Sequence, residues 1–194
     1  SGRYRYRDIS VICRDGERYT RLLSAALKRW DIPAFISEAR PVDAEPLMRF
    51  VLSAFDAVNG GWQSDDLLNM LKTGLTAFTA EEIALLEKYI FTWGLSGRAA
   101  WLAPFEKHPD GYGQPMDEAA AETLEQLNGL RARVTAPLQR FAGALRAGDG
   151  MSVSAAVYTL LTDFEIDRTL PEFCRALENA GRPDLAAEQI RIWD

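Results

Sequence analysis

Asp8-Ile-Ser-Val-Ile-Cys-Arg14, followed by the turn pair Asp15-Gly16, is the stretch that decides the expected fold of this 194-residue chain. Its run of Ile and Val is typical of a buried strand, and Asp-Gly is a common turn dipeptide. An amphipathic helical pattern follows, and Ile32-Pro-Ala-Phe-Ile36 predicts a second strand. Strands at 8–13 and 32–37 should lie parallel, with the helix between them as a right-handed crossover.

From residue 41 onward, apolar residues recur at helical spacing, which predicts a mainly α subdomain. Ser64-Asp65-Asp66 is placed to cap one helix, and Thr79 with Glu82 forms a capping box for another. Residues 94–115 lack periodicity, so we expect a long irregular loop, a kind of segment that is usually functional or disordered. Pro137 should kink or split the helix in which it lies.

These patterns divide the chain at the proline-bracketed loop that starts at Pro41. Residues 1–40 form the predicted N-terminal β-α-β piece, and residues 41–194 form the predicted helical subdomain. The last helical pattern, Ala186 to Trp193, meets no stop signal, so we expect the subdomain to be truncated at its C-terminal end. The expected fold class is mainly α with a short N-terminal β-α-β piece.

Composition is that of a soluble globular protein, with 47% hydrophobic and 26% charged residues. No apolar run approaches the ~20 residues of a membrane span, and no signal peptide opens the chain, so we expect a cytoplasmic protein without membrane contact. Cys13 and Cys174 lack partners at metal-ligand spacing, which predicts two buried thiols. With His108 as the single histidine, we expect no metal site.

The formal charge of −6 is unevenly spread along the chain. Residues 1–40 carry nine Lys/Arg against five Asp/Glu, a net of +4, which leaves −10 for the remainder. A basic surface that tracks nucleic acid over the whole protein is therefore excluded, and any phosphate-facing surface must be local.

Several short motifs occur in a recognisable order over nearly the whole chain. They are Arg5-Tyr6-Arg7-Asp8-Ile9, Ile32-Pro33-Ala34-Phe35-Ile36, Pro46-Leu47, Leu71-Lys72-Thr73-Gly74-Leu75, and Leu86-Glu87-Lys88-Tyr89-Ile90 followed by Trp93-Gly94. This series resembles the B subunit of the bacterial ATP-dependent helicase/deoxyribonuclease, the AddB/RexB type of the UvrD-like helicase superfamily. Lys-Thr-Gly-Leu followed by Leu-Glu-x-Tyr is its most specific part.

The resemblance implies a fragment that runs from the start of the second helicase-like domain, a P-loop helicase-like α/β domain, through the helical subdomain inserted in it. Such a subunit processes DNA double-strand breaks for homologous recombination, within an ATP-dependent exonuclease and helicase. Its implied partners are double-stranded DNA ends, single-stranded DNA and a motor A subunit. In this family the B subunit recognises a recombination hotspot sequence. ATP, magnesium and the iron–sulfur cluster of a nuclease domain would belong to the parent subunit, with no cofactor in this fragment.

The fragment itself carries no complete active site. The sequence lacks a Gly-x-x-x-x-Gly-Lys-Ser/Thr phosphate loop, a cluster-ligating cysteine set and a metal-binding carboxylate constellation. We therefore expect a DNA-binding or scaffold subdomain that alone hydrolyses no ATP and cuts no DNA. A stand-alone helical adaptor that binds only protein is the alternative.

The resemblance assigns possible ligand contacts to two places. Arg14 stands where UvrD-like helicases have an arginine that reaches the γ-phosphate, although Asp15-Gly16 replaces the family's Thr/Ser-Asn. Lys72, Thr73 and Gly74 stand where related helicases have a loop that touches duplex phosphates, and they are the predicted DNA-binding residues. The alternative for Arg14 is a surface arginine at the end of a strand. The alternative for Lys72, Thr73 and Gly74 is a plain joint between two helices.

Overall fold

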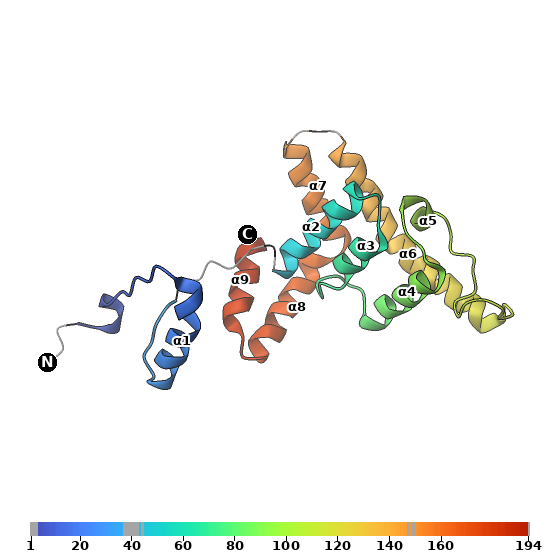
Figure 1. Ribbon diagram of the computed structural model, residues 1–194. Coiled ribbons are helices and arrows are strands. Elements are labelled where there is room, and N and C mark those ends of the chain that lie inside the picture. The colour runs from blue at the N-terminus through green and yellow to red at the C-terminus, as the bar shows by residue number, and fades with distance from the viewer. Residues whose placement is uncertain (1–3, 37–42, 44, 147, 149, 194) are drawn as a thin grey trace. The chain divides into compact units, whose positions relative to one another are not determined.

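The computed structural model describes residues 4–36, 43, 45–146, 148 and 150–193. The chain separates into two compact units, Ser1–Pro41 (unit 1) and Val42–Asp194 (unit 2). Helices are the regular elements of both units, and no strand occurs in the described residues (Figure 1). The prediction of a mainly α chain is confirmed. The assignment of residues 1–40 and 41–194 to a helicase-like domain and its inserted subdomain stays a prediction.

Unit 1 contains a single 3-10 turn, η1 (Tyr6–Asp8), and one helix, α1 (Gly16–Arg29), among its described residues. Helix α1 begins after Asp15 because the carboxylate of this residue accepts the backbone N–H of Arg18, at 3.3 Å. It ends where Asp31 adopts a left-handed φ of 50°, two residues before a proline. The local signals around the Asp-Gly pair therefore place a helix where the sequence predicts one.

The β-α-β piece predicted for residues 1–40 is not shown by the structure. Residues 9–13 and 32–36 have no regular secondary structure, and position 37 lies outside the described residues. A strand requires hydrogen bonds to a neighbouring strand and a surface for its apolar side chains. Neither is present in the described part of unit 1, where the side chains of Ile12 and Phe35 are 95% and 93% exposed. The apolar pattern alone therefore produces no strand there, and no right-handed crossover is formed.

Unit 2 is built from helices joined by short turns and one longer loop. In chain order they are α2 (Pro46–Asn59), α3 (Ser64–Leu71), α4 (Ala80–Trp93), α5 (Arg98–Leu102), α6 (Glu118–Leu145), α7 (Gly150–Asp163), α8 (Ile166–Asn179) and α9 (Pro183–Trp193). Helix α6 has 28 residues, with α4 and α5 beside its first part and α7 folded back along its end (Figure 1). Helices α8 and α9 form a second hairpin that contacts α7 and α2.

The core of unit 2 lies between α2, α3, α4, α6 and the C-terminal helices. Its centre contains edge-on aromatic pairs, with ring centroids 5.3 Å apart for Phe50 and Phe164 and 5.1 Å apart for Phe55 and Phe141. Aromatic pairs of this geometry add about 0.5–1.5 kcal/mol to the free energy gained from burial. These contacts join α2 to α6 and to the end of α7, residues that lie far apart in the sequence.

Pro137 lies inside α6, and the helix is not split there. A proline in a helix interior removes one N–H donor and costs about 3 kcal/mol relative to alanine. The Pro137 side chain is buried among the core residues of α6, and tertiary packing on both sides of it outweighs that cost. Of the predicted kink or split, the split is therefore wrong, and a kink at Pro137 stays a prediction.

The segment between α5 and α6 is held by side chains of neighbouring helices. The amide of Asn128 accepts the N–H of Phe105 at 2.8 Å and donates to the carbonyl of the same residue at 2.9 Å. The hydroxyl of Tyr89 accepts the N–H of Lys107 at 3.1 Å and donates to its carbonyl at 3.2 Å. Two side chains thus replace the backbone partners that an irregular segment lacks.

Two further donors bind the end of α5 and the middle of the same segment. Arg131 donates from Nη1 to the carbonyls of Trp101 and Leu102, each at 3.1 Å, and burial lowers the pKa of its guanidinium. The indole Nε1 of Trp93 donates to the carbonyl of His108 at 3.0 Å. Most of the predicted irregular stretch is consequently an ordered cover over α4 and α6.

The predicted cap of α3 is corrected by the structure. Gln63 occupies the N-cap position, and Ser64 is the first helical residue. The buried Ser64 hydroxyl donates to the carbonyl of Leu95 at 2.5 Å and accepts the indole N–H of Trp101 at 3.0 Å. Ser64 therefore joins α3 to α5 instead of capping its own helix, because partners distant in sequence are available to it.

Candidate functional site

Lys72, Thr73 and Gly74 form one tight turn after α3. Lys72 is the C-cap residue, and its N–H donates to the carbonyl of Leu68 at 2.9 Å. Thr73 is 8% exposed, and its hydroxyl donates to the carbonyl of Met70 at 2.9 Å. Gly74 adopts a left-handed φ of 77°. The Thr73 hydroxyl is thus occupied inside the protein, as a joint between two helices requires.

The lysine of this turn is paired with a carboxylate. The ammonium of Lys72 donates to Glu87 on α4, and both side chains are partly exposed. An ion pair at a protein surface contributes only about 0–1 kcal/mol, so a phosphate can displace Glu87 at small cost. Contact between this turn and DNA stays a prediction, with Lys72 as the cation of the turn.

The start of α4, which follows the turn, is capped by its own side chains. Thr79 and Glu82 form the predicted capping box, with Glu82 N–H to Thr79 Oγ1 at 3.2 Å and Thr79 N–H to Glu82 Oε2 at 2.9 Å. Arg133 of α6 pairs with Glu82 at 2.7 Å. Hydrogen bonds from the backbone and from Thr79 lower the pKa of Glu81. The N-terminal end of α4 therefore already holds two carboxylates.

Arg14 lies in unit 1, in the bend that precedes α1, and its side chain is exposed. The neighbouring Cys13 thiol approaches the carbonyl of Asp15 at 3.5 Å. The structure thus brings Lys72, Thr73 and Gly74 together in one turn of unit 2, whereas Arg14 belongs to the other unit. Contact between Arg14 and a nucleotide stays a prediction.

The two cysteines belong to different units and differ in exposure. Cys13 is exposed, so the prediction that it is buried is wrong; Cys174 is buried on α8, as predicted. Burial raises the pKa of the Cys174 thiol, which lies 3.7 Å from the carbonyl of Ala186. Among the described residues, no group of three or more His, Cys, Asp or Glu side chains could hold a metal ion. These residues do not fit an iron–sulfur cluster.

A pocket that the sequence did not reveal lies where three helices of unit 2 end or begin. Its volume is about 480 Å³, and its lining comes from the end of α2, the turn before α3, the start of α5 and the end of α6. The lining residues are Val58, Asn59, Gly61, Trp62, Arg98, Ala142, Leu145 and Arg146. We call it the two-arginine pocket, because Arg98 and Arg146 are its charged residues.

The turn at residues 60–62, which lines this pocket, has a backbone conformation that few residue types can adopt. A Cβ at Gly60 would lie 2.7 Å from the carbonyl oxygen of Asp56, and Gly61 has a φ of 79°, so both positions require glycine. Trp62 itself has a φ of 66°, which is unusual for a bulky residue. Its N–H donates to the carbonyl of Ala57 at 2.7 Å.

The start of α5 fixes this turn from the other side. The N–H of Gly97 donates to the carbonyl of Trp62, and the N–H of Arg98 donates to the carbonyl of Gly61, each at 3.0 Å. The Arg98 guanidinium lies 5.9 Å from the centre of the Trp62 ring. The strained turn is therefore held in place by hydrogen bonds from residues more than thirty positions away.

Comparison with known proteins identifies relatives over almost the whole chain. No protein-family model matches it. A protein of Clostridium novyi is 31% identical over 98% of this chain, which is 16% of that protein. Relatives from Pelotomaculum thermopropionicum and Moorella thermoacetica are 32% and 34% identical over 98% and 97% of this chain, 17% of each.

All three relatives bear the name of the B subunit of an ATP-dependent helicase/deoxyribonuclease. The chain spans about a sixth of the length of these relatives. The resemblance that the motifs indicate, to the B subunit of the bacterial helicase/deoxyribonuclease, is confirmed.

In the part of the chain that the structure describes, no helix is both long and apolar enough to cross a membrane.

Proposed function

We propose that this chain is one region of a helicase/deoxyribonuclease B subunit that processes DNA double-strand breaks for homologous recombination. Within that subunit it serves as a DNA-binding and scaffold subdomain. The observation that carries this proposal is the similarity over 97–98% of the chain to proteins of that name. The hydrogen bonds inside unit 2 support a structural role, because its polar side chains bind the backbone of neighbouring segments.

The proposed partners are those of such a subunit: a motor A subunit, double-stranded DNA ends and single-stranded DNA in the bacterial cytoplasm. We further propose that ATP with magnesium, and an iron–sulfur cluster, are bound by other regions of the complex. This division is supported by the donor set of the described residues, which does not fit a metal or cluster.

Residues 9–13 and 32–36 are proposed to become strands when unit 1 joins the sheet of a helicase-like α/β domain. Ile9, Val11, Ile12 and Phe35 are exposed in unit 1, and Ile12, at 95%, is the extreme case. Covering such side chains gains about 25 cal/mol per Å² of apolar surface, and a neighbouring strand supplies the missing hydrogen-bond partners. The two segments thus have the composition of strands without the sheet that would stabilise them.

The proposal is tested by purifying the natural polypeptide that carries this sequence, through an affinity tag, from its own cells. A large ATPase subunit should co-purify in a fixed ratio and survive a wash at high salt. Recovery of the polypeptide without any ATPase would contradict the proposal. Mass spectrometry of the eluate identifies the partner, and an unrelated tagged protein from the same cells is the control.

The DNA-contacting role of the turn after α3 gives a separate prediction. In the purified complex, Lys72→Glu should weaken binding to duplex ends and reduce the slope of log affinity against log salt by about one, because one phosphate contact is lost. Lys88→Glu is a matched control, since Lys88 is also exposed and paired, at 2.6 Å from Asp110. Equal affinity and salt slope for Lys72→Glu and the wild type would leave the turn as a helix joint.

A further inference from the structure

The lining of the two-arginine pocket combines three polar side chains with four apolar ones. Asn59 ends α2, Arg98 begins α5 and Arg146 follows α6, so three separate segments bring donors to one place. The apolar part comes from Val58, Trp62, Ala142 and Leu145. A volume of about 480 Å³ lies in the range of small-molecule sites, ~300–1,000 Å³.

The cations of unit 2 differ in whether they are paired with a carboxylate. Lys72, Lys88, Arg133, Arg140 and Arg168 each form an ion pair with a carboxylate. In the part of the chain that the structure describes, the guanidinium groups of the two pocket arginines form no ion pair. The carboxylate nearest the Gly60 turn, Asp66, does not line the pocket.

Two unpaired guanidinium groups that line one pocket repel each other and attract an anion. The surrounding unit is acidic, with a net charge of −10 over residues 41–194, so a positive potential at this pocket is local. Guanidinium binds phosphate through paired, charge-assisted hydrogen bonds, which makes a phosphate group the natural ligand of two arginines. The amide of Asn59 can donate one more hydrogen bond to the same ligand.

The pocket is also held in one shape before any ligand binds. Trp62 keeps a φ of 66° only because backbone hydrogen bonds from Gly97 and Arg98 fix the turn on one side and Ala57 fixes it on the other. Backbone strain that the surrounding structure maintains is a feature of ligand sites. A preformed site also avoids the entropy cost of ordering a loop on binding.

We propose that the two-arginine pocket binds the phosphate group of a nucleotide unit, with Arg98 and Arg146 on the phosphate and the apolar lining residues against the attached sugar and base. The phosphate belongs either to a nucleic-acid strand or to a free nucleotide, and both present the same chemistry to the two guanidinium groups. This inference stands on the pocket alone and does not depend on the proposed function of the chain.

The test is isothermal titration calorimetry on the full chain with three probes. They are adenosine monophosphate, a short single-stranded oligonucleotide with a 5′-phosphate, and the same oligonucleotide with a 5′-hydroxyl. Arg98→Gln and Arg146→Gln should each weaken the binding of every probe that the wild type binds about tenfold or more, because a hydrogen bond to a charged group is lost. Both side chains are exposed, so thermal unfolding should stay unchanged.

Arg175→Gln is the matched control, since it removes the same charge from an exposed arginine of α8 that lies outside the pocket. The affinity of the Arg175→Gln variant for each probe should remain within about twofold of that of the wild type, because a distant charge is screened by salt. Tighter binding of an oligonucleotide than of adenosine monophosphate supports a nucleic-acid source, and equal binding supports a free nucleotide.

Absence of binding by all three probes, or equal weakening by all three substitutions, would overturn the proposal. So would binding that Arg98→Gln and Arg146→Gln leave unchanged. None of these results bears on co-purification with an ATPase, which tests the proposed function separately.

Discussion

Replacing Trp101 by alanine should lower the free energy of unfolding of unit 2 by about 3–5 kcal/mol. The Trp101 side chain is 1% exposed, and its ring centroid lies 6.2 Å from that of Phe105. Its indole N–H donates to the Ser64 hydroxyl at 3.0 Å, so the substitution both opens a cavity and leaves a buried hydroxyl with one partner fewer. Urea unfolding followed by far-ultraviolet circular dichroism measures the change.

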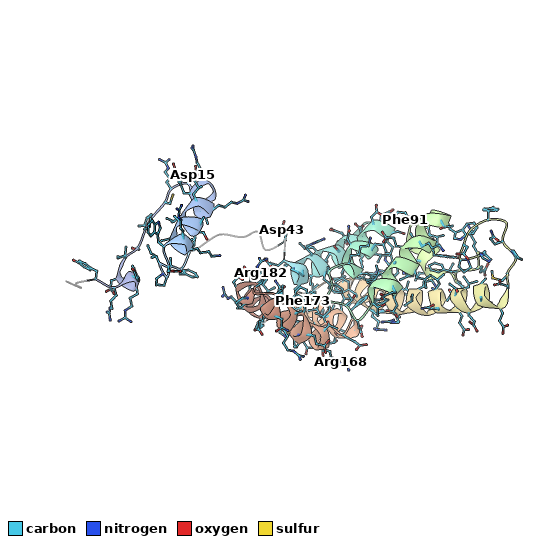
Figure 2. All side chains as sticks on the ribbon, turned by 90° about the horizontal axis from the view of Figure 1, so that it is seen from below. Asp15, Asp43, Phe91, Arg168, Phe173 and Arg182 are labelled. Atoms are coloured by element: carbon cyan, nitrogen blue, oxygen red, sulfur yellow. The ribbon has the colours of Figure 1, made fainter. Side chains whose placement is uncertain are left out.

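Two further variants separate packing from a general effect of substitution. Trp101→Phe keeps most of the apolar volume, so it should lower the free energy of unfolding by less than Trp101→Ala does. Phe91→Ala removes an aromatic side chain that is 64% exposed and extends from the outer side of α4 (Figure 2), so it should change the free energy by no more than about 0.5 kcal/mol. Equal costs for Trp101→Ala and Phe91→Ala would contradict the packing described for α5.

Asn128→Ala should lower the free energy of unfolding by about 2 kcal/mol. It should also free the segment that covers α4 and α6 to exchange its amide hydrogens. The Asn128 amide supplies partners for both backbone groups of Phe105, and their loss leaves two partly buried polar groups unpaired, each at about 1–3 kcal/mol when fully buried. Hydrogen exchange followed by mass spectrometry should show lost protection over residues 103–117, while α2 and α8 keep theirs.

Thr123→Ala is the control for this variant. Thr123 lies on the same helix, and its exposed hydroxyl donates to the carbonyl of Ala119 within that helix. It should change neither the free energy of unfolding by more than about 0.5 kcal/mol nor the exchange of the covering segment. Unchanged exchange over residues 103–117 in Asn128→Ala would show that this segment is held by other contacts.

Local signals explain how much of the fold the sequence could predict. The capping box at Thr79 and Glu82 uses residues three positions apart, and it is formed as predicted. The other helices of unit 2 follow from apolar spacing in the same way, except α5 (Arg98–Leu102), which lies in the stretch predicted to be irregular. Ser64 was misassigned because its partners, Leu95 and Trp101, lie 31 and 37 positions away. The strands predicted for unit 1 failed for a related reason, since a strand depends on a neighbour that local sequence does not contain.

At the candidate site, too, contacts between residues distant in the sequence could not be predicted from local patterns. The turn at Lys72 was found by its resemblance to a family motif, but the ion pair with Glu87 became visible only in the structure. Arg98 and Arg146 carry no signal in the sequence, because they are separated by nearly fifty residues and belong to no motif. The paired glycines at positions 60 and 61 are the signal that the sequence offers, and such a pair indicates a break between helices without indicating what the break forms.

The central claim is that the chain works within a helicase/deoxyribonuclease, and ATP-dependent degradation of linear duplex DNA by the purified complex tests it most directly. The natural polypeptide that carries this sequence, co-purified with its ATPase partner, should degrade linear duplex when ATP and magnesium are present and leave covalently closed circles intact. The substitution Trp101→Ala should reduce this activity at temperatures where unit 2 unfolds, whereas Phe91→Ala should not. A complex that degrades no DNA in the presence of ATP, or degrades it equally without ATP, would contradict the claim.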